Sequence, residues 1–219
     1  MVRALERMVP ADPGRPELAG PDHPVRLVTR QVAFEAGSWT PERAHEVAAM
    51  FDEAAGAWDE RAHARRLEPL EDALARGGRF PDRPCLEVGS GTGLATSLLA
   101  ARFSPVMAVD LSAAMLARAG GRSPLRLRAD ASALPVADGR AGVVVLVNMF
   151  LFPAEVDRVL APDGVVVWVN TLGDATPIHL PAGDVAAALP GTWDGVAAEA
   201  GWGTWATLRR GRAPAAGAG

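Results

Sequence analysis

Three glycines at every second position, Gly89, Gly91 and Gly93, follow a short apolar stretch and precede a helical pattern. Glycine adopts positive φ without a steric penalty and lets the backbone approach a ligand closely. A helix that begins at such a turn directs its free N–H groups and the positive end of its dipole toward the same ligand. Residues 84–103 therefore predict a site for a nucleotide-type cofactor at the carboxyl end of a parallel strand.

Two aspartates follow at the ends of the next two predicted strands. Asp110 lies about 20 residues beyond the first glycine, the separation at which a carboxylate binds the ribose hydroxyls of a nucleotide. The alternative is that Asp110 caps the following helix, but Ser112 can supply that cap. Asp130 is either a second cofactor ligand or an ordinary loop aspartate. The order of glycine loop, acid and acid favours the cofactor interpretation for both residues.

The glycine spacing and the segments around it resemble one family. A dinucleotide fingerprint would place its third glycine at position 94, which is Leu94. The chain instead has G-x-G-x-G preceded by Glu87, and residues 158–164 read RVLAPDG, with Asp163 at a position where glycine is common. In these motifs, which extend over residues 84–170, the chain resembles the class I S-adenosylmethionine-dependent methyltransferases. The resemblance implies S-adenosylmethionine as the cofactor.

The resemblance also implies a role for each matching residue. Gly89 and Gly91 would shape the turn around the methionine part of the cofactor, and Gly93 would open the helix. Glu87 would order the loop or the cofactor's ammonium group, or it would only make a structural hydrogen bond. In the family, an acid at the position of Asp130 receives the adenine amino group, and the next N–H faces a ring nitrogen. The residues expected to bind the cofactor are Glu87, Gly89, Ser90, Gly91, Gly93, Asp110, Leu111, Asp130, Ala131 and Asn148.

The acceptor is expected beside the end of the fourth strand, where Asn148 either binds a ligand or turns the chain. The family often has an aromatic–Asp pair at the start of this strand, but here the residues are Ala141 and Gly142. A general base is needed only for an acceptor that is protonated. His179 and His63 are the candidates, and a structural histidine is the alternative for each. The sequence shows no metal-ligand spacing, so no metal is expected.

Alternating short strands and helices from residue 84 onward must position these side chains. They include strands at Cys85–Val88 and Val106–Asp110, followed by helices that begin at Leu94 and Ala113. They predict an α/β fold, a doubly wound, mostly parallel sheet with helices on both faces, as in Rossmann-like methyltransferases. An N-terminal helical cap is expected, with a short strand at 25–34 and a helix at about 58–75. Near the end, we expect a helix at 193–200 and an edge strand at 202–210 that pairs antiparallel. The expected divisions are a flexible leader (1–24), a substrate-covering cap (25–80), a cofactor-binding domain (81–210) and a disordered tail (211–219).

Composition limits the partners and the compartment. The 219 residues carry a net charge of -4 and no basic run, so a small-molecule acceptor is expected rather than nucleic acid. A lone cysteine and the lack of a signal peptide or a long apolar run predict a cytoplasmic protein without a membrane segment, either monomer or homodimer. The expected reaction is methyl transfer to an O, N, S or C atom. The alternatives are a non-catalytic or regulatory cofactor-binding protein and an NAD-dependent oxidoreductase.

Overall fold

The computed structural model describes residues 1–11, 13–15, 22–61 and 64–211. Within them, one sheet contains the strands β1 (Val2–Ala4), β2 (Cys85–Val88), β3 (Val106–Asp110), β4 (Arg126–Arg128), β5 (Ala141–Val147), β6 (Leu160–Asn170), β7 (Trp193–Ala200) and β8 (Gly203–Arg210). Their order is β1-β7-β8-β6-β5-β2-β3-β4. Strand β8 runs antiparallel to both of its neighbours, and the other pairs are parallel. This arrangement confirms the predicted mostly parallel α/β sheet.

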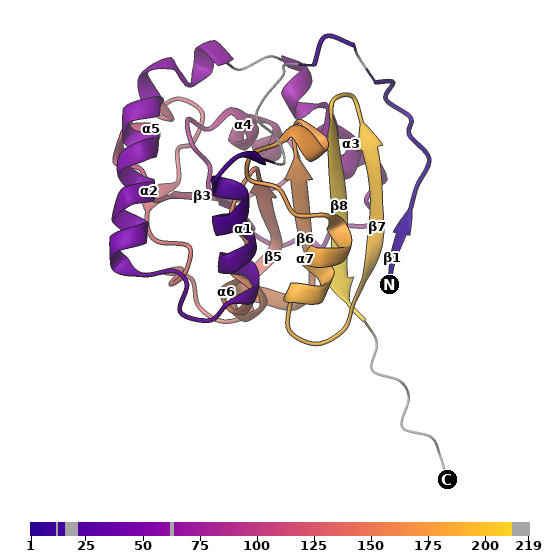
Figure 1. The fold of residues 1–219 in the computed structure, drawn as a ribbon. Helices are drawn as coiled ribbons and strands as arrows, with labels where there is room; N and C mark the ends of the chain where they lie inside the picture. The colour runs from indigo at the N-terminus through magenta and orange to yellow at the C-terminus, as the bar shows by residue number, and fades with distance from the viewer. Residues whose placement is uncertain (12, 16–21, 62–63, 212–219) are drawn as a thin grey trace.

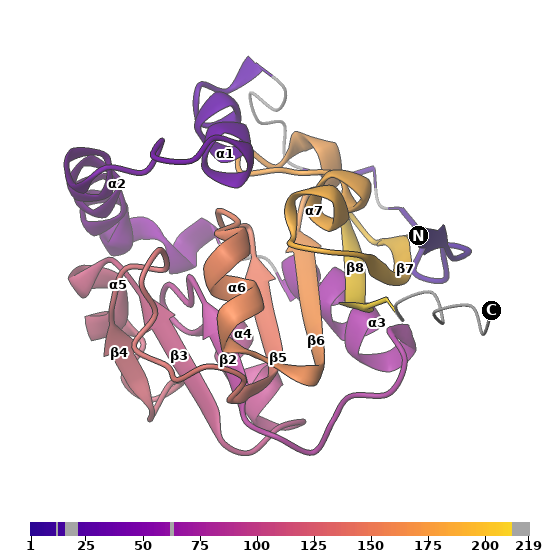
Figure 2. The ribbon, with the colours of Figure 1, turned by 90° about the horizontal axis from the view of Figure 1, so that it is seen from below.

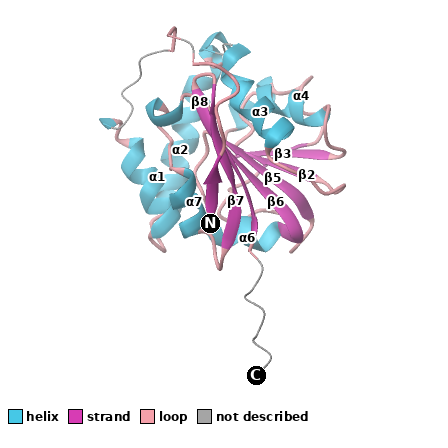
Figure 3. Cartoon of the chain, turned by 90° about the vertical axis from the view of Figure 1, so that its right-hand side faces the viewer, coloured by secondary structure: helices cyan, strands magenta, loops and turns pink. Residues whose placement is uncertain are grey.

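Helices cover both faces of this sheet (Figures 1 and 2). They are α1 (Val25–Phe34), α2 (Pro41–Ala54), α3 (Glu68–Arg76), α4 (Leu94–Ala100), α5 (Ala113–Arg118), α6 (Pro153–Val159) and α7 (Ala182–Ala188). Helices α1, α6 and α7 pack on one face, whereas α3 and α4 pack on the other, as the edge-on view in Figure 3 shows. Successive residues of β5 alternate between the two cores, with Val144 and Leu146 in one and Val143 and Val145 in the other. Burial on both faces explains why this strand is continuously apolar.

The predicted type of secondary structure is wrong for two segments of the chain. Residues 25–34 form helix α1 rather than a strand, because Thr29, Val32 and Ala33 are buried together at helical spacing. Residues 193–200 form strand β7 rather than a helix, because they pair along their whole length with β8. A Cβ on Gly195 would lie 2.0 Å from the Thr207 carbonyl oxygen, so this residue lets the two strands come close.

Two further expectations also need correction. The helix predicted over about 58–75 is split into short 3-10 turns, at Asp59–Arg61 and Ala64–Leu67, before α3 begins. Strand β8 is antiparallel as predicted, but it lies between β6 and β7 rather than at the edge.

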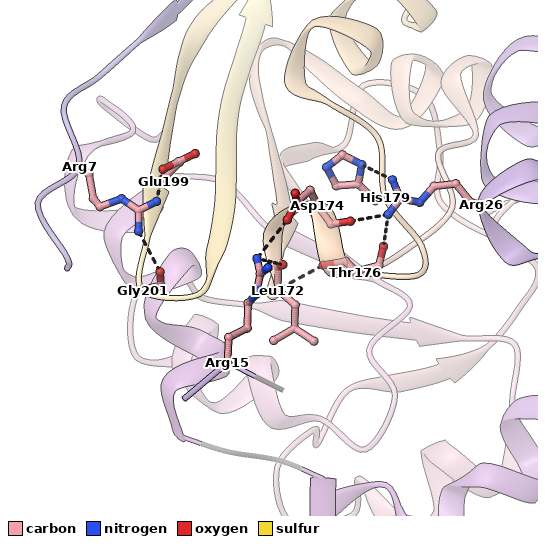
Figure 4. Close-up of polar contacts among 9 residues, drawn as sticks. All are labelled: Arg7, Arg15, Arg26, Leu172, Asp174, Thr176, His179, Glu199 and Gly201. Carbon is pink, nitrogen blue, oxygen red and sulfur yellow. Dashed lines mark hydrogen bonds and ion pairs between the residues drawn. The ribbon is translucent and has the colours of Figure 1, made fainter. Parts of the chain in front are cut away.

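The first residues of the chain are ordered along the sheet, where the sequence predicted a flexible leader. Val2–Ala4 pairs in parallel with β7 and so covers an edge that would otherwise expose unpaired backbone groups. Arg7 then donates hydrogen bonds to Glu199 and to the Gly201 carbonyl, and Arg15 donates one to Asp174 (Figure 4). These residues therefore contact the sheet and the loop after β6, and the division of the chain that begins with a flexible leader stays a prediction. The predicted disordered tail lies outside the described residues except for Gly211.

Candidate cofactor and acceptor site

The predicted glycine loop lies between β2 and α4, at the carboxyl end of the central strand. Gly89, Gly91 and Gly93 all have positive φ, between 55° and 79°. At Gly93 a Cβ would lie 2.6 Å from Ser123 Oγ, so both the conformation and the space favour glycine at the start of α4. The hydroxyl of Ser90 is buried, and no hydrogen-bond partner for it is present in the described part of the chain. A buried hydroxyl without a partner in this turn is available to form a hydrogen bond with a polar ligand.

Asp110 lies at the end of β3 and faces this loop. Its carboxylate accepts hydrogen bonds from the Gly91 N–H at 2.7 Å and from the Ser112 N–H at 2.8 Å. Burial raises the pKa of Asp110 above its usual range, and the backbone hydrogen bonds oppose that rise. Ser112 itself caps α5 by accepting from the Met115 N–H at 3.0 Å, so Asp110 is not the helix cap. The neighbouring Leu111 uses its carbonyl to accept from Arg128.

Glu87 is buried beneath the loop. The Thr96 hydroxyl donates to it at 2.5 Å, and the Ser123 hydroxyl donates to Thr96 Oγ1 at 2.8 Å. Burial raises the pKa of Glu87 to about 8, with a smaller contribution from the Asp110 carboxylate. Glu87 is therefore mostly protonated at neutral pH, and its contacts agree with the structural interpretation.

Asp130 lies in the turn after β4, where its carboxylate binds a residue from the N-terminal region. The Trp39 indole N–H lies 3.1 Å from Asp130 Oδ1 and 3.0 Å from Oδ2, and the Ser132 N–H donates to Oδ1 at 2.8 Å. Ala131 is buried in the same turn. Sequence reasoning missed Trp39 as a partner for this aspartate, because 91 residues separate the two.

Asn148 connects the ends of two neighbouring strands. Its amide NH₂ donates to Thr171 Oγ1 at 2.8 Å, and its carbonyl oxygen accepts from the Thr171 N–H at 2.8 Å. The residue has a positive φ of 49°, a conformation that asparagine tolerates better than most residues. These contacts agree with the turn interpretation, and a role for Asn148 in cofactor binding stays a prediction.

The cap lies over the carboxyl end of the sheet through α2 and the turn after it. Asp52 accepts from the Ser112 hydroxyl at 2.5 Å and from the Ala114 N–H at 3.0 Å. Asp59 accepts from the Thr92 hydroxyl at 2.5 Å and from Arg122 at 2.7 Å. These hydrogen bonds lower the pKa values of Asp52 and Asp59.

Neither cap aspartate was a predicted site residue. A usable signal was present, however, because the aromatic–Asp pairs Phe51-Asp52 and Trp58-Asp59 lie seven residues apart. Seven residues correspond to about two helical turns, so the pairs could face the same neighbour. Their aromatic rings are in edge-to-face contact at 5.8 Å.

His179 follows β6 and contacts the cap (Figure 4). Arg26 lies 3.2 Å from His179 Nδ1, and because arginine only donates, Nδ1 is the acceptor. Burial and the Arg26 guanidinium lower the pKa of His179, so the ring is neutral at neutral pH. The lone pair that a base would use is therefore engaged, and catalysis by His179 stays a prediction. His63 lies outside the described residues.

Gly142 shows why an acid is missing at the start of β5. It lies at the opposite end of the strand from Asn148, and a Cβ there would be 2.3 Å from Arg83 Cβ. No side chain fits at this position without displacing the backbone or Arg83. The absence of the acid follows from packing at the amino end of the strand.

One open groove lies away from the predicted site. Its volume is about 600 Å³, and it lies near the amino ends of β2, β3 and β4, lined by residues such as Pro84, Met107 and Leu125. The connection at 129–140 contains no helix to cover this part of the sheet.

The described residues contain no group of three or more His, Cys, Asp or Glu side chains arranged to hold a metal ion. None of the described helices has the length and apolar character needed to cross a membrane.

Comparison with known proteins agrees with this geometry. Residues 86–168 match the family model described as "Methyltransferase domain". A search of curated protein sequences found no match.

Solved structures share the fold. DhpI in complex with SAH is 20% identical with a TM-score of 0.61, covering 78% of this chain and 98% of that one. A SAM dependent methyltransferase from Aquifex aeolicus is 17% identical with a TM-score of 0.57, covering 72% and 96%. A complex of the Haloferax volcanii Trm112 methyltransferase activator with a methyltransferase gives 24% identity and a TM-score of 0.50, covering 56% of this chain and 59% of that one. This chain thus spans less than two thirds of the last protein.

The fold, the glycine loop and the family match define a methyltransferase domain. Residues 86–168 thus form a methyltransferase domain of the kind that this family model describes, on a fold shared with S-adenosylmethionine-dependent methyltransferases of known structure, and S-adenosylmethionine is the cofactor that these matches indicate.

Proposed function

We propose that this methyltransferase acts on an O, N, S or C atom of a small-molecule acceptor. The cap carries the proposal, because Asp52 and Asp59 attach it to the start of α5 and to the glycine loop. A site covered in this way by the chain's own helices favours a small acceptor over a folded macromolecule. The net charge of -4 also gives no support to a nucleic-acid acceptor.

The residues at the carboxyl end of the sheet fit the cofactor. Ser90 offers a buried hydroxyl without a partner among the described residues, and the half-buried carboxylate of Asp110 faces the glycine loop. We propose that Asp110 accepts hydrogen bonds from the ribose hydroxyls and that Asp130 accepts one from the adenine amino group. When bound, S-adenosylmethionine supplies an electrophilic methyl group on a positively charged sulfur.

The chain's own contribution is alignment and exclusion of water. Phe150 and Phe152 are buried at the start of α6, and both pack against Trp39 from the cap. Apolar walls of this kind keep water from a reacting centre, which matters more here than strong acid–base catalysis. We also propose that residues 25–80 act as the substrate-covering cap and residues 81–210 as the cofactor-binding domain.

Formation of S-adenosylhomocysteine tests the proposal. The purified chain is incubated with S-adenosylmethionine and a panel of amines, thiols, phenols and carboxylic acids, or with tRNA or a protein mixture. We expect turnover with a member of the small-molecule panel and none above background with the macromolecules. Turnover only with tRNA or protein would contradict a small-molecule acceptor. The Asp110→Ala variant is the control, since it should lose turnover if the signal comes from this site.

A further inference from the structure

One side chain of the cap already binds the carboxylate that we assign to the adenine amino group. The Trp39 indole N–H lies at nearly equal distances from the two oxygens of Asp130, 3.1 and 3.0 Å. An indole N–H and an adenine amino group are both donors, so they require the same kind of acceptor. The single indole N–H is shared between both oxygens and the Ser132 N–H also binds Oδ1, so each oxygen of this carboxylate already has a donor.

The ring of Trp39 is held in this place by packing. Its centroid lies 5.1 Å from that of Phe152 in an edge-to-face arrangement and 5.7 Å from that of Phe150. Such aromatic pairs contribute beyond the area that they bury. The indole is therefore a fixed partner of Asp130 in the free chain.

Two other side chains lie close to the glycine loop. A Cβ on Gly89 would lie 2.4 Å from Met149 Sδ, so the Met149 side chain lies directly against this glycine. A Cβ on Gly91 would lie 3.8 Å from the Trp58 indole nitrogen, again from the cap. Met149, Trp58 and Trp39 thus lie against three of the groups expected to contact the cofactor, and the contact of Trp39 is a hydrogen bond.

We propose that Trp39 competes with the cofactor for Asp130, so that binding exchanges the indole hydrogen bond for one from adenine and releases the cap at this point. This inference rests on the proposed role of Asp130. It makes Trp39 a residue that weakens cofactor binding in the closed chain. A residue that merely lined the cofactor pocket would strengthen binding, so the two roles differ in the sign of the effect.

Calorimetric titration with S-adenosylhomocysteine tests that sign. Trp39→Phe removes the N–H but keeps an aromatic ring against the two phenylalanines. We expect about tenfold tighter binding, since one hydrogen bond to a charged group no longer has to be broken. Trp193→Phe is the matched control, because it also removes a buried indole hydrogen bond, 2.8 Å to the Pro190 carbonyl, at a site away from the cofactor. The control should leave the affinity unchanged.

The indole N–H signals in nitrogen-15 NMR spectra supply a readout independent of affinity. Trp39→Phe identifies the Trp39 signal, and we expect this signal to move more than the other indole signals when S-adenosylhomocysteine binds. Unchanged or weaker binding by Trp39→Phe, with a normal response of the wild-type chain, would overturn the competition and leave the proposed function intact. Binding by neither the wild type nor the variant would overturn both.

Discussion

Replacing the buried Glu87 with glutamine should change how stability depends on pH. Burial raises the pKa of Glu87 to about 8, whereas a glutamate in the unfolded chain titrates near its ordinary value of about 4.5. Between these values the unfolded chain has released this proton and the folded chain still holds it. The folded state is therefore favoured at low pH, and this contribution is lost as the pH rises toward 8.

The magnitude follows from the size of the shift. Each pH unit inside the window costs at most about 1.4 kcal/mol, because one proton separates the folded and unfolded states. Between pH 5 and pH 8, the wild type should lose about 3–4 kcal/mol of unfolding free energy relative to Glu87→Gln. Glutamine resembles the protonated acid and can still accept the hydrogen bond from Thr96, so the two proteins should have similar stability at pH 5.

Urea unfolding at pH 5, 6, 7 and 8, followed by tryptophan fluorescence, measures this difference. Glu53→Gln provides the control, because it removes one carboxylate from an exposed position on α2 and changes the charge of the unfolded chain equally. We expect the control to follow the wild type. A difference between wild type and Glu87→Gln that stays constant within about 1 kcal/mol across this range would show that Glu87 is ionised in the folded chain, which would refute the reasoning.

Two further substitutions test the cofactor contact and the sheet. Asp110→Ala should weaken S-adenosylhomocysteine binding by about 1–3 kcal/mol in calorimetric titration, through lost charge-assisted hydrogen bonds; unchanged affinity in a folded variant would remove Asp110 from the site. Asp72→Ala should lower the unfolding free energy, measured in urea, by about 3 kcal/mol. The Asp72 carboxylate accepts hydrogen bonds from Arg76 Nε and from the buried Trp205 indole N–H, each at 2.7 Å, and the substitution leaves both donors without an acceptor. A loss below 1 kcal/mol would mean that water replaces the carboxylate.

The central strands were predictable because their signal is local. Cys85–Val88 and Val106–Asp110 have the predicted bounds, since each is a short apolar run that ends at a turn residue or an acid. Helices α4 and α5 begin at the predicted residues, since a glycine and a serine cap mark these positions. Capping and burial on both faces therefore account for the part of the fold that positions the cofactor loop.

The outer elements were less predictable because pairing and packing decide them. Strand β7 contains Gly195 and several alanines, a composition without a strong preference, and its pairing with β8 and β1 fixes it as a strand. Helix α1 contains apolar residues at alternating positions, Val25 and Leu27 and then Val32 and Phe34, which also suited a strand. Its contact with α7 and the core selects the helix.

The contact between Trp39 and Asp130 could not be predicted from the motifs for a further physical reason, which concerns the site before the cofactor binds. A site that binds a polar cofactor contains carboxylates and hydroxyls that are partly removed from water, and each is costly unless a donor or acceptor meets it. In this chain Gly91 and Ser112 N–H groups meet Asp110, and the Trp39 indole meets Asp130. A sequence motif indicates which groups would bind the cofactor. It does not indicate which other residues of the chain form hydrogen bonds with these groups before the cofactor binds. The affinity of such a site depends on the difference between these two sets of contacts, and a change in the cap can therefore alter it without touching the motif.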